Sequence, residues 1–66
     1  MGSRVDTREK AFELTGIVTS QLLSIKDGVM REDIISALNR LSQETSDWAV
    51  WAGCVKAVKM MRSRGN

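Results

Sequence analysis

The chain contains no histidine, no proline and no tyrosine, and its only cysteine is Cys54. Without histidine or a second cysteine, the usual zinc sites cannot form, and one cysteine cannot close an internal disulfide. We therefore expect no metal and no other cofactor. A domain of 66 residues is marginally stable and commonly depends on a disulfide, a metal or oligomerisation. The stability must then come from close helix packing or from oligomerisation.

Long hydrophobic runs are absent as well. The longest apolar stretch without a charge is Trp48–Val55, far short of the roughly 20 residues that a membrane-spanning helix needs. The segment Met1–Lys10 is polar and carries charges of both signs, unlike a secretory signal. A lone cysteine is typical of a reducing compartment. These features predict a soluble, cytoplasmic protein with no membrane partner.

Groups suited to catalysis are scarce. The acidic residues are scattered at positions typical of helix caps and solvated helix faces. Cys54 has no neighbouring base that could activate it as a nucleophile, and its default role is that of a small buried hydrophobic residue. No glycine-rich phosphate loop is present, since Gly28 stands alone. We predict that the protein is not an enzyme.

The absence of proline and of alternating polar and apolar residues favours helices over strands. We predict a single all-α domain over residues 1–66, a small three-helix bundle with helices at about 7–26, 31–42 and 46–62. The first helix should begin after Asp6, with Glu9 completing a capping box. It should end before Gly28, and Gly28 should adopt the left-handed conformation that commonly follows a helix. Met30 is a poor cap for the second helix, and Thr45 or Ser46 should cap the third.

Apolar spacing predicts which faces are buried. The first two helices each carry one apolar stripe, which should face a shared core. The predicted stripes comprise Ala11, Leu14, Val18, Leu22 and Ile25 in the first helix, and Ile34, Ile35, Leu38 and Leu41 in the second.

The third helix is apolar around most of its circumference and has a small residue at every fourth position: Ala49, Gly53 and Ala57. Two short amphipathic helices can hardly cover it, so we expect a homodimer through this helix, with the small residues setting the distance of approach. The other interpretation is a central helix covered within one chain. One tryptophan should be in the core and Trp48 should be the exposed anchor. The predicted partner-binding residues are Trp48, Ala49, Trp51, Gly53, Val55, Ala57, Val58 and Met61.

Glycine inside a helix costs about 1 kcal/mol relative to alanine, so Gly16 and Gly53 should mark close packing. Gly16 lies between Phe12 and Leu23, on the side away from the main stripe of the first helix. We predict that Phe12, Gly16 and Leu23 form a second contact patch. The alternative is that these residues pack within the same bundle.

The end of the chain is basic. No acidic residue follows Asp47, whereas Lys56, Lys59, Arg62 and Arg64 do. This stripe could contact phosphates in a DNA- or RNA-binding regulator of helix-turn-helix-like topology. It could equally serve only to stabilise the end of the helix. The start of the third helix is acidic and then apolar, unlike a helix that reads base edges.

The preferred hypothesis is therefore a non-enzymatic interaction or regulatory module. Its partner should be a second copy of itself, and another protein is a further candidate. In the alternative hypothesis the partner is a nucleic acid, and this is the less favoured of the two.

Overall fold

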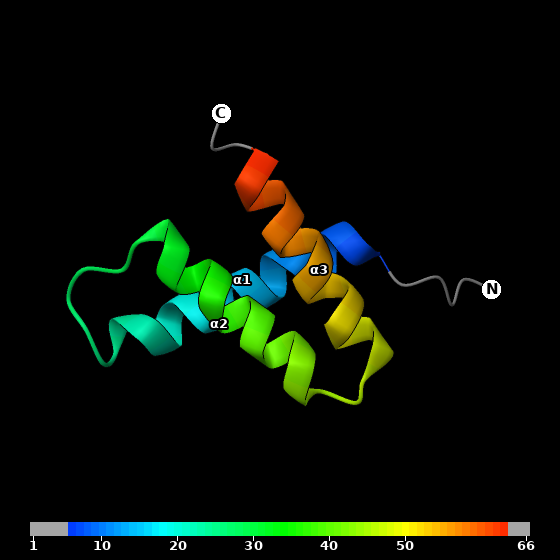
Figure 1. Cartoon of the computed structure of the whole chain (residues 1–66), viewed down its shortest axis with the longest axis horizontal. Helices are drawn as coiled ribbons and strands as arrows, with labels where there is room; N and C mark the ends of the chain where they lie inside the picture. The colour runs from blue at the N-terminus through cyan, green and yellow to red at the C-terminus, as the bar shows by residue number, and fades with distance from the viewer. Residues whose placement is uncertain (1–5, 64–66) are drawn as a thin grey trace.

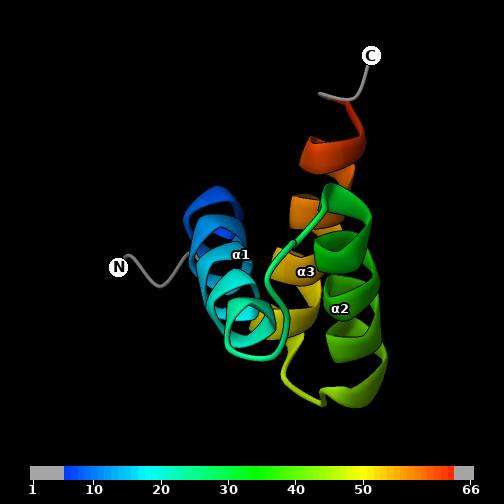
Figure 2. The same ribbon diagram turned by 90° about the vertical axis from the view of Figure 1, so that its left-hand side faces the viewer.

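The computed structural model describes residues 6–63, which form three helices. These are α1 (Thr7–Leu23), α2 (Arg31–Glu44) and α3 (Trp48–Ser63). Helix α3 packs extensively against both other helices, while α1 and α2 contact each other less (Figures 1 and 2). The prediction of an all-α, three-helix fold is confirmed. No helix within residues 6–63 has the length and apolar character required to cross a membrane.

The core draws on all three helices and is built from small and medium-sized side chains. Helix α2 contributes one completely buried residue, Leu38, at the centre. The predicted stripe of α1 is buried as far as Val18, but Ile25 is 77% exposed and lies beyond the end of the helix. The buried residues are Ala11, Leu14, Val18, Leu38, Cys54, Ala57 and Val58.

Helix α1 ends earlier than predicted. The hydroxyl of Ser24 donates a hydrogen bond to the carbonyl oxygen of Gln21 (2.7 Å), and the backbone N–H of Ser24 is shared between the carbonyls of Ser20 and Gln21. Local side-chain bonds of this kind compete with continuation of the helix. The prediction that Gly28 provides a left-handed stop is wrong, because its φ lies outside the left-handed region.

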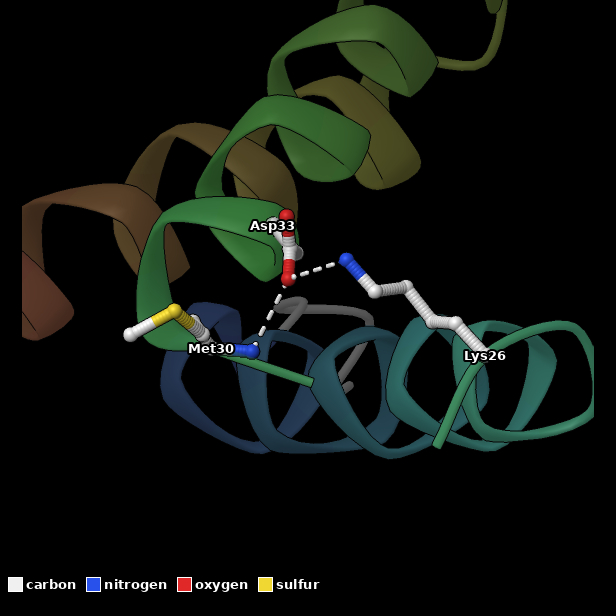
Figure 3. Close-up of polar contacts among 3 residues, drawn as sticks. All are labelled: Lys26, Met30 and Asp33. Atoms are coloured by element: carbon white, nitrogen blue, oxygen red, sulfur yellow. Dashed lines mark hydrogen bonds and ion pairs between the residues drawn. The ribbon is translucent and has the colours of Figure 1, made fainter. Parts of the chain in front are cut away.

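The start of α2 depends on one carboxylate (Figure 3). Asp33 Oδ2 accepts hydrogen bonds from the backbone N–H of Met30 (2.9 Å) and from Lys26 Nζ (3.0 Å). The backbone bond from Met30, followed by the bond from Lys26, lowers the pKa of Asp33 below the usual aspartate range. The Met30 side chain forms no capping bond, as its type predicted, and Asp33 satisfies the helix terminus from within the first turn.

A lowered pKa in the folded state implies stability that is present above the usual aspartate pKa and is lost as the pH falls through the lowered value. We expect Asp33→Asn to be less stable than the parent at neutral pH. The difference should shrink as the pH falls below about 4. Chemical denaturation followed by circular dichroism at several pH values measures it.

The control variant is Asp27→Asn. Asp27 lies in the same connection and forms no hydrogen bond or ion pair within the part of the chain that the structure describes. A difference for Asp33→Asn that stays constant down to pH values well below 4 would contradict the assigned role of the charge.

Helix α3 is capped by Asp47, not by the predicted Thr45 or Ser46. Asp47 Oδ1 accepts a hydrogen bond from the backbone N–H of Ala49 (2.9 Å), and its carbonyl oxygen accepts one from Trp51 (2.9 Å). Thr45 instead supports the turn, since its Oγ1 accepts from the N–H of Asp47 (3.0 Å). The short connection of residues 45–47 makes α2 and α3 an antiparallel pair (Figure 1).

Helices α1 and α3 approach each other closely at Gly53. A methyl group built on Gly53 would lie 2.8 Å from Leu14 Cδ1 and 2.8 Å from Lys10 Cγ. Close packing at this glycine was predicted and is confirmed. The same prediction for Gly16 is wrong, because a methyl group built there has no other atom within 4 Å.

The two glycines allow a matched test of this packing. Both positions gain about 1 kcal/mol of helix propensity on substitution by alanine. Gly16→Ala should therefore raise the free energy of unfolding by about 0.5–1 kcal/mol. Gly53→Ala should fall at least about 1 kcal/mol below Gly16→Ala, because Leu14 and Lys10 must move. Urea unfolding of the two variants decides the point, and equal stabilisation by both would refute the close approach.

Candidate functional site

The buried and the exposed residues of α3 differ in the size of their side chains. The residues that pack against the other helices are Gly53, Cys54, Ala57 and Val58, all of them buried. The exposed face of the helix carries Trp48, Trp51 and Val55, which we call the aromatic stripe.

The aromatic stripe is exposed along its whole length. Trp48 is 66% exposed, Trp51 47% and Val55 41%. Residues at spacings of three and four lie on one face of a helix, so these three form one continuous surface. The prediction that one tryptophan is in the core is wrong, since the two largest side chains of α3 both lie outside. That Trp48 is the more exposed of the two is confirmed.

The eight predicted partner-binding residues include buried, half-buried and exposed side chains. Gly53, Ala57 and Val58 belong to the core of the single chain, so the row of small residues accommodates α1 instead of a second copy. Ala49 and Met61 are half-buried at the edges of the helix. Of these eight residues, the three of the aromatic stripe are therefore the ones exposed to a partner.

Basic residues continue the aromatic stripe toward the end of α3. Lys59 and Arg62 are exposed and line a hollow of about 260 Å³ together with Asn39, Val55 and Val58. Neither cation has a carboxylate oxygen within 4 Å among residues 6–63. Of the other predicted basic residues, Lys56 is half-buried and does not line this hollow. Arg64 lies outside the described residues.

A further cation close to the end of α3 was not predicted. Arg31 Nη1 donates a hydrogen bond to the carbonyl oxygen of Met61 (3.4 Å). Arg31 stands thirty residues earlier in the sequence. Only the antiparallel packing of α2 on α3 brings it there, so no local pattern could have identified it.

The predicted second contact patch is exposed. Phe12 and Leu23 are large apolar side chains in solvent, and the space next to Gly16 is open. The alternative, that these residues pack within the bundle, therefore does not hold. Phe12 borders a small hollow of about 140 Å³ formed with Met60 and Met61 of α3. Leu23 lies eleven residues away, about 16 Å along the helix, so the patch is two separate apolar points.

Another hollow, of about 530 Å³, lies between α1 and α2, where these helices pack less closely. Apolar side chains such as Val18 and Leu41 line it, together with Asp33, Arg40 and Glu44. These charged groups are already paired, Asp33 with Lys26 and Arg40 with Glu44. The hollow offers apolar surface and no unpaired acid–base group of obvious use in a reaction.

The chemistry available within residues 6–63 is limited. The Cys54 thiol is completely buried, and burial raises its pKa, so it stays protonated and is a poor nucleophile. No group of three possible metal ligands is found within the same residues. Comparisons with family models, with curated proteins and with solved structures find no match to this chain.

The assignment of the tryptophans to the surface can be tested by truncation. Measured at a protein concentration low enough to keep the chain monomeric, Trp48→Ala should change the free energy of unfolding by at most about 0.5 kcal/mol, as expected for a surface residue. Leu38→Ala, at a completely buried position, should cost about 2–5 kcal/mol or prevent folding. A cost for Trp48→Ala as large as that for Leu38→Ala would place Trp48 in the core.

Proposed function

We propose that this chain is a non-enzymatic interaction module that associates with a second copy of itself through the aromatic stripe. The observation that carries the proposal is the exposure of both tryptophans on one face of α3, next to an exposed valine. Tryptophan is enriched among the residues that dominate binding energy at protein interfaces. Single exposed apolar residues are ordinary, but contiguous ones indicate a contact surface.

The size of the aromatic stripe sets the expected strength of association. If a fully exposed tryptophan presents about 250 Å², the two rings leave about 280 Å² in water. Covering all of it would contribute at most about 7 kcal/mol per chain at 25 cal/mol per Å². Association itself costs about 4–15 kcal/mol. We therefore expect a dimer that dissociates on dilution, as suits a regulatory contact. The lone thiol is compatible with a reducing compartment, and we propose the cytoplasm as the location.

Sedimentation equilibrium over a range of concentrations, at low and at high salt, tests the proposal. The parent should form a dimer that persists at high salt, because apolar association holds or strengthens there. The double variant Trp48→Ala/Trp51→Ala should associate at least about 30-fold more weakly, since one interface tryptophan alone is commonly worth 2 kcal/mol or more.

A matched control uses the other exposed apolar pair. The double variant Phe12→Ala/Leu23→Ala removes a similar exposed surface from α1 and should leave the dimer intact. A parent that stays monomeric at every concentration would overturn the proposal. A dimer lost only in the control variant would move the interface to α1.

The second candidate function is phosphate binding to DNA or RNA, which is favoured by one observation. Lys59 and Arg62 line a common hollow without a carboxylate partner within residues 6–63, and Arg31 is nearby at the end of α3. Binding of a labelled duplex measured by fluorescence anisotropy should then weaken with salt, with a log–log slope no steeper than about −3 for three phosphate contacts. Absence of binding at low salt would dismiss this candidate.

A further inference from the structure

Five exposed residues form a line along α3, and their spacing in the sequence is symmetric about the central one. They are spaced at three, four, four and three residues, with Val55 at the centre. All five are exposed in the folded chain: Trp48, Trp51, Val55, Lys59 and Arg62. One half of the line is aromatic and the other half is cationic.

This symmetry has a consequence for pairing with a second copy. In a two-fold dimer, a residue that contacts a second residue across the interface is matched by the reciprocal contact. If two α3 helices lie antiparallel with their Val55 residues at the axis, Trp51 and Lys59 are each about 6 Å from the centre and on opposite chains. Trp48 and Arg62 are each about 10 Å from it. Every aromatic ring is then opposite a cation.

The chemistry of these contacts favours the antiparallel arrangement. A lysine or arginine over an indole face is attracted by the ring and is the best cation–π pairing in proteins. The residues from Leu41 to Val55 include two acidic side chains and no basic one, and those from Lys56 to Ser63 include three basic side chains and no acidic one. Antiparallel pairing brings the basic end of one chain to the acidic end of the other. Parallel pairing would place Lys59 on Lys59 and Arg62 on Arg62.

The hollow beside Val55 offers a seat for a ring from the second copy. Its volume of about 260 Å³ is several times the roughly 30 Å³ that a water molecule occupies in the liquid. Its walls combine the apolar Val55 and Val58 with the cation Lys59 and the amide of Asn39. An indole needs apolar contact and a hydrogen-bond acceptor for its N–H, and the carbonyl oxygen of an asparagine amide can accept.

We propose that the partner is a second copy bound antiparallel through α3, with the two-fold axis at Val55 and with Trp51 of each chain seated in the hollow of the other. Trp48 of each chain then lies against the partner's Arg62. This proposal rests on the self-association proposed above and specifies its geometry. It also predicts that dimerisation and phosphate binding compete, because both use Lys59 and Arg62.

Spin labels at two positions of α3 distinguish the geometries. In a Cys54→Ala background that retains the dimer, a nitroxide is attached to Ser63→Cys or to Lys56→Cys. Ser63 lies eight residues from the axis, so an antiparallel dimer separates its two labels by about 24 Å along the helix. Lys56 lies one residue from the axis, so its labels should be separated mainly by the distance between the helices, about 8–10 Å. Electron paramagnetic resonance measures both distances.

Each outcome has a defined meaning. A long Ser63 distance with a short Lys56 distance supports the proposal. Two short distances indicate parallel helices, which overturns the antiparallel geometry and leaves self-association standing. Two long distances place the interface away from α3 and also overturn it. A parent chain that never dimerises refutes the self-association on which the inference rests.

Arg62 provides an independent arm that needs no label. Arg62→Ala should weaken the dimer at least about fivefold, because two symmetric cation–π contacts are lost. Arg40→Ala is the matched control, since Arg40 is an exposed arginine on α2 that lines the hollow between α1 and α2. Equal dissociation constants for the Arg62→Ala variant and the parent would contradict the contact between Trp48 and the partner's Arg62.

Discussion

The contact between α1 and α3 at Gly53 determines how the rest of the molecule is arranged. With no side chain at this position, Leu14 and the stem of Lys10 reach the backbone of α3. That contact fixes the rotation of α3 about its own axis. Its small residues, Gly53, Cys54 and Ala57, turn inward, and everything bulky on the opposite face turns to solvent. The exposure of the aromatic stripe is thus a consequence of how closely two helices pack.

This arrangement reverses what is usual in a small domain, where large aromatic side chains supply most of the buried apolar area. Here the core consists of leucine, valine, alanine and cysteine, and both tryptophans remain outside. A core of this size is marginal for a chain of 66 residues. Burying the tryptophans against a second chain would add apolar area that the single chain lacks, so folding stability and association would be linked.

Sequence reasoning succeeded where local chemistry decides. Asp6 caps α1 as its pattern indicates, and the apolar spacing identified Ala11, Leu14, Val18 and Leu38 as core residues. It failed where packing between helices decides. Gly16 and Gly53 are indistinguishable in sequence, yet only Gly53 faces another helix closely. The apolar circumference of α3 gave no means of deciding which side faces inward, so one tryptophan was wrongly assigned to the core. The hollow lined by Lys59 and Arg62 also includes Asn39 of α2, so it depends on contacts between α2 and α3 that no local pattern contains.

The placement of the tryptophans also determines what light can report about this molecule. The chain has two tryptophans and no tyrosine, so its ultraviolet fluorescence comes almost entirely from one face of α3. In the single folded chain both rings are in contact with water, Trp48 more than Trp51. Unfolding therefore exposes mainly the covered part of Trp51, whereas covering that face moves both rings out of water. Intrinsic fluorescence in this protein therefore responds to anything that covers this face of α3, and the integrity of the fold is better followed through the backbone.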